Sequence, residues 1–201
     1  MDEDNVIRII SIVVFVAIIA GMAAGAYWLK SHRVQPKQTQ IVYNNFYFVR
    51  DTTNNFWGTQ WQNNGRLYEL QFRYLPNETL DVPIDGQINQ SFFNSTIYIT
   101  FNPSQSNLQN MTLAVGELSL NLARGLDYDI AAACTQNATG CENRPIVTCE
   151  KNQTVPVIYL VEKEQTKVTL SGNCMVLQGQ GRELLRSVDR ILYVWYKIVS
   201  T

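Results

Sequence analysis

The chain has 201 residues, a formal net charge of −1, four cysteines and a single histidine, His32. This length predicts one domain, alone or with an appendage, and the 46% hydrophobic content argues against disorder as the main state. No basic block is present, so the sequence gives no reason to expect nucleic-acid binding. Because His32 lies close to the N-terminus, an imidazole base or a histidine-ligated metal is excluded from the rest of the chain.

Residues 9–28 form the first element, an uncharged run that ends in Tyr27 and Trp28. The run is about as long as a helix must be to cross ~30 Å of hydrocarbon, and aromatic rings favour the membrane interface. A cleaved signal peptide is the alternative, since the sequence Ala-Gly-Ala at 24–26 resembles a signal-peptidase site. The acidic residues before the run make a poor leader, so we expect an uncleaved transmembrane anchor at 1–30 and a polar stalk at 31–40.

The flanking charges and the downstream sequence disagree about the side of the membrane on which the remaining domain, 41–201, lies. Lys30, Arg33 and Lys37 follow the run and favour the cytoplasm. Long domains are translocated largely regardless of such charges, and the N-glycosylation pattern Asn-x-Ser/Thr recurs after the run. Loops rich in Asn and Thr also generate this pattern freely. We expect an extracytoplasmic domain, with candidate glycosylation sites at Asn77, Asn89, Asn94, Asn110, Asn137 and Asn152.

The first part of this domain predicts an antiparallel meander of three strands, at 42–50, 55–61 and 66–74. Residues 66–74 alternate apolar and polar side chains, as a half-buried strand does. Asn-Gly at 64–65 favours a hairpin turn because both residues tolerate positive φ. The aromatic side chains of the meander could form a ligand face, although such residues more often belong to a core.

The second part changes period. Apolar residues three and four apart over 108–122 predict an amphipathic helix with Gly125 as its C-terminal cap, and strands are expected on either side, at 96–101 and 128–134. Further strands at 145–149, 155–161, 167–170 and 174–178 precede a last helix at 182–199. The predicted fold class is α/β or α+β: a transmembrane helix, a β-rich meander and a mixed sheet with two packed helices, held by disulfides.

The four cysteines, Cys134, Cys141, Cys149 and Cys174, follow the predicted anchor and predict two disulfides. Their spacing matches no Cys-x2-Cys zinc pattern and no histidine is available nearby, but a four-thiolate zinc site or free buried thiols stay open if the domain is cytosolic. Of the three connectivities we favour Cys134–Cys141, which closes a short loop, and Cys149–Cys174, which joins two strands.

Few other side chains suggest chemistry. Glu117 lies beside the apolar stripe of the first helix, where burial would raise the pKa of its carboxyl, although a solvent-facing place at the edge of the stripe is the alternative. Asp189 is another isolated carboxylate, and no spacing rule links it to Glu117. The turn Gly179-Gln180-Gly181 could hold an anion at a helix N-terminus, but it completes neither a dinucleotide fingerprint nor a P-loop. A tight connection is the simpler interpretation.

The stretch ACTQNATGCENRPIVTC at 133–149, followed by VIYL, GNC and ELLRSVDRILYVWYKI, resembles uncharacterised single-pass membrane proteins of small-genome archaea. The resemblance covers residues 113–198. It implies a place at an archaeal cell surface, where Asn-linked glycosylation also occurs, and it carries no activity or binding residue with it.

We therefore expect a membrane-anchored surface domain with a structural or protein-interaction role, a lipid bilayer as its first partner, and no catalytic residue, cofactor or metal. One alternative is an envelope enzyme that uses Glu117, Asp189 or the turn at Gly179–Gly181. The other is an accessory subunit that associates through Gly21 and Gly25, whose spacing is typical of contacts between spanning helices. Glycine is also common in such helices without any contact role.

Overall fold

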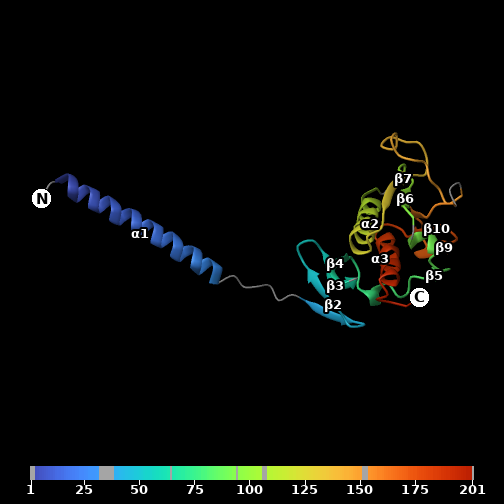
Figure 1. The fold of residues 1–201 in the computed structure, drawn as a ribbon, viewed down its shortest axis with the longest axis horizontal. Helices are drawn as coiled ribbons and strands as arrows, with labels where there is room; N and C mark the ends of the chain where they lie inside the picture. The colour runs from blue at the N-terminus through green and yellow to red at the C-terminus, as the bar shows by residue number, and fades with distance from the viewer. Residues whose placement is uncertain are drawn as a thin grey trace. The chain divides into compact units, whose positions relative to one another are not determined.

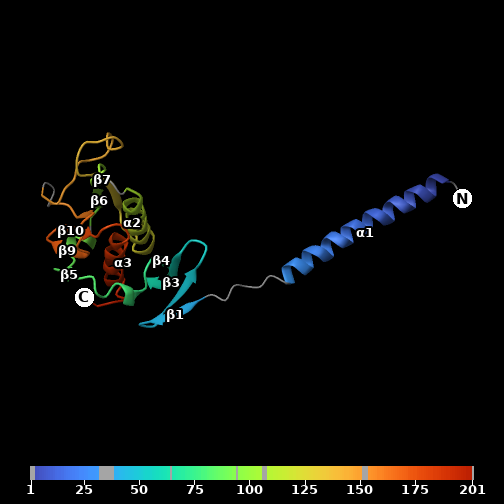
Figure 2. The same ribbon diagram turned by 180° about the vertical axis from the view of Figure 1, so that it is seen from behind.

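The computed structural model describes residues 3–31, 39–63, 65–93, 95–105, 108–150 and 154–200. The chain divides into two compact units, Met1–Lys37 and Gln38–Thr201. In the first unit, the described residues form helix α1 (Glu3–Ser31) (Figure 1). The second is a mixed α/β domain with two sheets, two longer helices and two disulfides (Figure 2).

The run at 9–28 that the sequence predicts to be a membrane span lies within α1. Among the described residues, however, no helix has both the length and the apolar character that a bilayer crossing requires. The transmembrane segment is therefore not supported by the structure. An added Cβ at Gly21 or Gly25 would meet no described atom within 4 Å, so no helix partner is seen for them. Most of the predicted stalk lies outside the described residues.

An antiparallel sheet of four strands opens the second unit, where the sequence predicts three. Its strands pair in chain order: β1 (Gln40–Tyr43), β2 (Phe46–Asp51), β3 (Phe56–Asn63) and β4 (Arg66–Phe72). The extra strand arises because Asn44 and Asn45 both adopt positive φ, 45° and 67°, and fold the stretch into a hairpin. Asparagine tolerates this left-handed region better than most residues, so the pair forms a turn within the predicted first strand.

A mixed sheet of six strands forms the rest of the β structure, in the order β5-β9-β10-β8-β6-β7. Strands β10, β8, β6 and β7 run parallel, and β9 pairs antiparallel with β10 through a turn at Gly172. The predicted strand–helix–strand unit is confirmed, because β6 and β7 are parallel neighbours. The short β5 lies in a stretch that the sequence predicts to be a loop. The strand predicted at 145–149 is reduced to a single parallel bridge between Ile146 and Cys134. The strands are β5 (Ile84–Asp85), β6 (Ile97–Phe101), β7 (Ile130–Cys134), β8 (Val157–Val161), β9 (Lys167–Ser171) and β10 (Cys174–Gln178).

Helix α3 (Glu183–Trp195) lies between the two sheets (Figure 1). It contacts β9 and β10 of one sheet, while Tyr193 packs against Phe48 and Phe72 of the other, with ring centroids 6.0 and 4.4 Å apart. The helix ends before the predicted residue 199, and Lys197 adopts a positive φ of 59° just beyond it. The aromatic residues of the four-stranded sheet thus form core on its helix side, because a sheet with one apolar face must bury that face.

Helix α2 (Leu108–Leu120) packs beside α3 and continues as one π-helical turn, η3 (Asn121–Gly125). The predicted role of Gly125 as a left-handed cap is wrong, since its φ is not positive. Instead, an added Cβ would lie 2.2 Å from Tyr196 Oη and 2.9 Å from Leu70 Cδ2. Glycine is needed here for a close approach that brings the end of the helix against β4. Two short 3-10 turns, η1 (Pro76–Glu78) and η2 (Gln90–Phe93), complete the domain.

Candidate functional site

The two isolated carboxylates, Glu117 on α2 and Asp189 on α3, meet at the end of β4. The Arg73 N–H donates to Glu117 Oε1 (3.0 Å) and to Asp189 Oδ2 (2.9 Å), and the Tyr74 N–H also donates to Asp189 Oδ2 (2.8 Å). Arg73 Nε lies 3.3 Å from Glu117 Oε2. The carboxyl pair therefore fastens the end of the strand to both helices, a link that no spacing in the sequence indicates.

Burial governs the electrostatics of this carboxyl pair. The Asp189 side chain is fully buried, and only 7% of the Glu117 side chain is exposed. Desolvation raises the pKa of Asp189 well above its usual range, and repulsion from Glu117 raises it further. Desolvation also raises the pKa of Glu117, against the lowering effects of the neighbouring Asp189 carboxyl and of the Arg73 charge. Because the two buried carboxyls lie close together and repel each other when both are charged, they titrate as a pair.

A groove runs along the free edge of β4, between this strand and the helical segment α2–η3, and encloses about 420 Å³. One wall is formed by residues 67–73, and the other by one face of the helix between residues 112 and 125. Figure 1 shows β4 as the strand of its sheet that lies nearest the helices. Arg73 on the strand and Glu117 on the helix lie toward one end of the groove. Arg124 lies on the helical wall, near the end of η3.

The main-chain N–H and C=O groups of successive β4 residues point alternately toward β3 and toward the groove. Toward the groove, the Gln71 carbonyl accepts a hydrogen bond from Asn121 Nδ2 (3.0 Å), and the Arg73 N–H donates to the carboxyl pair. Two and four residues upstream of Gln71, the main-chain groups of Glu69 and Leu67 point to the same side. β4 is an edge strand, and none of the described residues hydrogen-bonds to these groups.

The helical wall of the groove carries two exposed leucines with a gap between them. Leu113 and Leu120 are 43% and 47% exposed, and between them an added Cβ at Gly116 would meet nothing within 4 Å among the described atoms. The sequence holds a signal that the prediction passed over: both leucines lie off the apolar stripe of the helix, and Leu67 interrupts the polar face of β4. Apolar residues on faces that should be polar mark a surface for contact.

The turn at Gly179–Gly181 is a tight connection. An added Cβ at Gly179 would lie 2.5 Å from the carbonyl carbon of Glu183, and Gly181 adopts a positive φ of 59°. The Gly181 N–H, which an anion would need, instead donates to Glu162 Oε1 at 3.3 Å. The polar hollow beside it is lined by Glu162 and Glu164 as well as by Lys163, so its two carboxylates outnumber its one cation and disfavour an anionic ligand.

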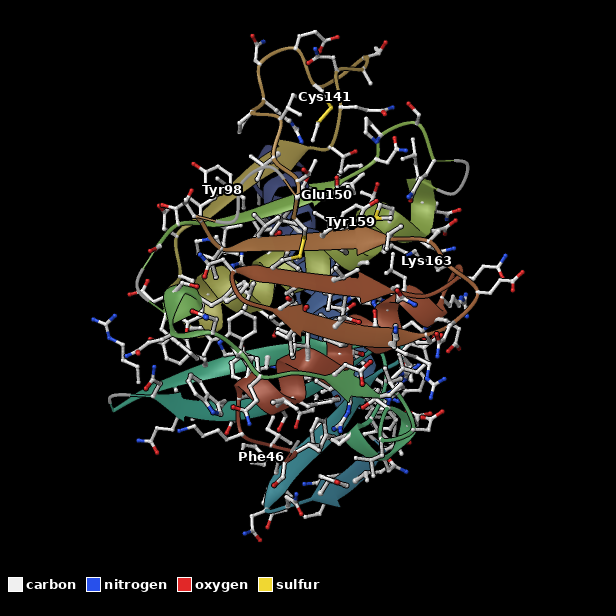
Figure 3. The ribbon with its side chains drawn as sticks, turned by 90° about the vertical axis from the view of Figure 1, so that its right-hand side faces the viewer. Phe46, Tyr98, Cys141, Glu150, Tyr159 and Lys163 are labelled. Atoms are coloured by element: carbon white, nitrogen blue, oxygen red, sulfur yellow. A yellow bond between two sulfur atoms is a disulfide. The ribbon has the colours of Figure 1, made fainter. Side chains whose placement is uncertain are left out.

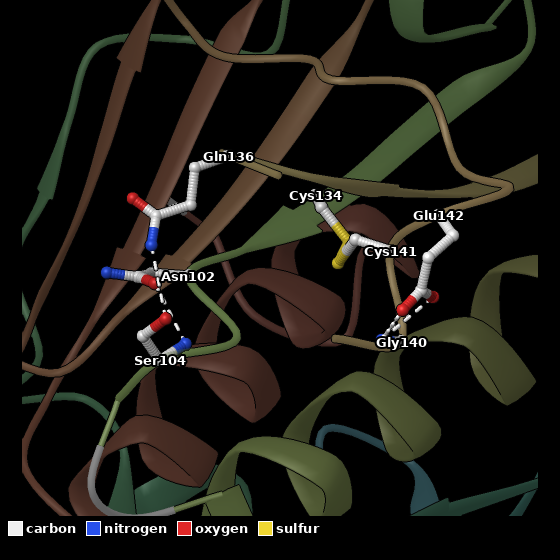
Figure 4. The surroundings of a disulfide bond; sticks show 7 residues. All are labelled: Asn102, Ser104, Cys134, Gln136, Gly140, Cys141 and Glu142. Carbon is white, nitrogen blue, oxygen red and sulfur yellow. Dashed lines mark hydrogen bonds between the residues drawn. A yellow bond between two sulfur atoms is a disulfide. The ribbon is translucent and has the colours of Figure 1, made fainter. Parts of the chain in front are cut away.

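All four cysteines are paired, and the favoured connectivity is confirmed: Cys134–Cys141 and Cys149–Cys174. Figure 4 shows the first disulfide, which closes a loop at the end of β7 where Glu142 accepts a hydrogen bond from the Gly140 N–H. The second ties the same long loop to the start of β10 (Figure 3). Within the part of the chain that the structure describes, no group of three or more metal-binding side chains comes together.

The glycosylation candidates lie in different settings. Three of them are exposed, namely Asn77, Asn89 and Asn137. Asn110, on α2, is half-buried, and Asn94 and Asn152 fall outside the described residues. The exposed three leave room for a sugar, which the sequence pattern alone could not establish.

Comparison with known proteins gave no match to a protein-family model, to a curated protein or to a solved structure. The resemblance to archaeal membrane proteins therefore stays a prediction. The function has to be argued from the groove and the carboxyl pair themselves.

Proposed function

We propose that residues 41–201 form a protein-interaction domain that binds an extended polypeptide segment by adding it as a further strand to β4. The observation that carries this proposal is that the main-chain groups of Leu67 and Glu69 on the edge of β4, unpaired among the described residues, face a helical wall with exposed leucines across a groove of about 420 Å³. An extended segment can form a ladder with the groups at Leu67 and Glu69, while the helix covers its side chains. Main-chain hydrogen bonds then supply affinity, and the helical wall supplies specificity.

Binding fits the carboxyl pair better than catalysis does. A general acid or base must reach the proton that it transfers, but Asp189 is fully buried and accepts two main-chain N–H groups. Glu117 is also occupied, by the main chain and the side chain of Arg73. We infer that the pair holds the end of β4 at a fixed distance from α2, which keeps the groove open.

The setting proposed for this domain is the outside of a membrane, with the chain anchored through residues 9–28. What supports an oxidising compartment is that every cysteine is in a disulfide. A surface domain that captures a segment of another protein agrees with this setting and with the interaction role predicted from the sequence.

The test uses Glu69→Pro in the full chain. The Glu69 N–H points into the groove, so proline removes a donor for the added strand and leaves the ladder with β3 intact. Glu69→Gln is the control, because it keeps the N–H. Both variants and the wild type are screened against a displayed library of random short peptides, and hydrogen exchange of the β4 amides is measured with any enriched peptide.

We expect the wild type and Glu69→Gln to enrich common peptides that protect the amides of Leu67, Glu69 and Gln71 from exchange. Glu69→Pro should keep its melting temperature within a few degrees and lose the enrichment. The proposal fails if no peptide is enriched, or if enriched peptides bind Glu69→Pro as well as the wild type.

A further inference from the structure

Gly116 is the feature of the groove that still needs a reason. Glycine in a helix interior costs roughly 0.5–1 kcal/mol relative to alanine, and no described atom crowds this position, since an added Cβ would meet nothing within 4 Å. Close packing within the domain therefore does not explain it, in contrast to Gly125. The helix carries Leu113 and Leu120 one turn before and after Gly116, so the gap between them has an apolar rim.

Arg124 supplies the charge of the same wall. It is exposed and lines the groove, and no ion pair or hydrogen bond joins its guanidinium to the residues that the structure describes. The other arginine of the groove, Arg73, is engaged by Glu117 and by the carbonyls of Asn54 and Asn55. The groove thus has one cationic group available for a ligand, and an arginine fork is shaped to bind a carboxylate.

We infer that the bound segment carries a bulky apolar side chain that fills the gap over Gly116 and a carboxylate that pairs with Arg124. This inference rests on the proposed function and specifies its ligand. The two positions are eight residues apart along the helical segment, which is roughly 12 Å at the α-helical rise. An extended chain covers that distance in about four residues, and side chains that far apart point to the same side of a strand. The ligand therefore has its carboxylate about four residues from its apolar anchor.

The test uses two substitutions, each expected to reverse the preference of the groove for one of these two ligand side chains. Gly116→Leu fills the gap, and Arg124→Glu reverses the charge, while neither position packs against the core. Gly116→Ala is the control for helix propensity, because it adds a methyl group without closing the gap, and Arg124→Gln is the control for loss of charge alone. Each full-length variant is offered a library of short synthetic peptides, made with amidated and with free C-termini.

We expect the wild type to select a Leu, Ile, Phe or Met and a carboxylate about four residues away. Gly116→Leu should shift the first position to Gly or Ala, and Arg124→Glu should shift the second to Lys or Arg. Replacing the anchor of a selected peptide by alanine should weaken its binding to the wild type roughly tenfold or more. Replacing an acidic side chain by its amide should weaken binding roughly fivefold.

The amidated and free-acid peptides distinguish the source of the carboxylate. Selection in both forms assigns it to an Asp or Glu side chain, and selection of free acids alone assigns it to the C-terminus of the segment. Selected peptides that protect the β4 amides but show neither preference would overturn this inference and leave the proposed function standing. Absence of any selected peptide would count against the proposed function itself, and with it this inference.

Discussion

At the scale of single residues, the Arg73 amide decides how the strand is held. Two carboxyls, from helices that are 72 positions apart at Glu117 and Asp189, accept this one N–H. Bringing both into the interior costs free energy unless a proton is shared, because two buried like charges repel. The arrangement ties the stability of the domain to pH through groups that are distant in the sequence.

The first prediction concerns the pH dependence of stability. The folded-state pKa of Asp189 is raised, chiefly by desolvation and then by Glu117, so the native state binds this proton more tightly than the unfolded chain does. The stabilisation is present in full below the unfolded pKa, about 4, and is lost as the pH rises through the folded pKa. Asp189→Asn still accepts the N–H groups of Arg73 and Tyr74 and carries no charge. We expect it to flatten the decline in unfolding free energy above pH ~4.

Urea unfolding followed from acid to neutral pH measures this effect. Asp85→Asn is the control, because the Asp85 side chain is 63% exposed and lies 3.7 Å from the Lys167 ammonium at the surface, and it should keep the slope of the wild type. Asp189→Ala leaves the Tyr74 N–H unpaired, while the Arg73 N–H keeps Glu117 Oε1 as its acceptor, and this loss should cost about 1–3 kcal/mol. A slope for Asp189→Asn equal to that of the wild type would show that the pair does not bind a shared proton.

The second prediction separates two glycines of one helical segment. Gly125→Ala places a methyl group 2.2 Å from Tyr196 Oη, and relieving this overlap should cost about 1–3 kcal/mol of unfolding free energy. Gly116→Ala meets open space and should gain about 0.5–1 kcal/mol from helix propensity. Chemical denaturation of the two variants beside the wild type measures both values. Equal effects at the two positions would contradict the close approach of η3 to the tyrosine.

At the scale of elements, local patterns predicted most strands and both helices of the domain. The alternation at 66–74 correctly placed Leu70 and Phe72 in the core, and the change of period marked α2 between parallel strands. The hairpin at Asn44 and Asn45 was missed because a turn made of two asparagines sits inside an aromatic run that continues on both sides. β5 was missed because a strand of two residues has no period of its own.

The groove could not be predicted in the same way, because it depends on which element lies beside the free edge of β4. Strand pairing within a hairpin is local, whereas the contact between β4 and η3 joins segments about 50 residues apart, as the Asn121–Gln71 hydrogen bond shows. The sequence does contain its components, namely Leu67 on a polar face and Gly116 in a helix. Without the three-dimensional arrangement, each of these residues is only a local exception to the expected pattern of its strand or helix.

The third prediction ranks the two disulfides. Cys134–Cys141 closes a loop with a sequence separation of 7, and Cys149–Cys174 one of 25. On a chain-entropy basis the longer loop contributes more, about 3.5 against about 2.4 kcal/mol. Double alanine variants of each pair, compared by urea unfolding, should therefore rank in this order. The reverse order would mean that contacts in the folded loop outweigh the entropy of the unfolded chain.

At the scale of the whole molecule, the domain places its two disulfides and its groove in different regions. The cysteine loop extends from the end where β7 lies, and the groove runs beside β4, which packs on the other side of the helices (Figure 1). Sheet and helix contacts, rather than disulfides, surround the groove. The shape of the groove therefore does not depend on the disulfide-bonded loop.

The last prediction concerns the compartment in which the chain folds. Disulfides persist outside the cytosol, where thiols are not kept reduced, and the exposed Asn77, Asn89 and Asn137 would then also meet the glycosylation machinery. Protein isolated from its native cells under thiol-blocking conditions should therefore show no free thiol among its four cysteines. Intact-mass measurement reports both the blocked thiols and any attached sugar, and a sample reduced before blocking shows that all cysteines can react. Suppose that all four cysteines react with the blocking reagent without prior reduction, and that the mass shows no attached sugar. This result would place the folded domain in a reducing compartment, and the ligand of the groove would then be a cytosolic protein.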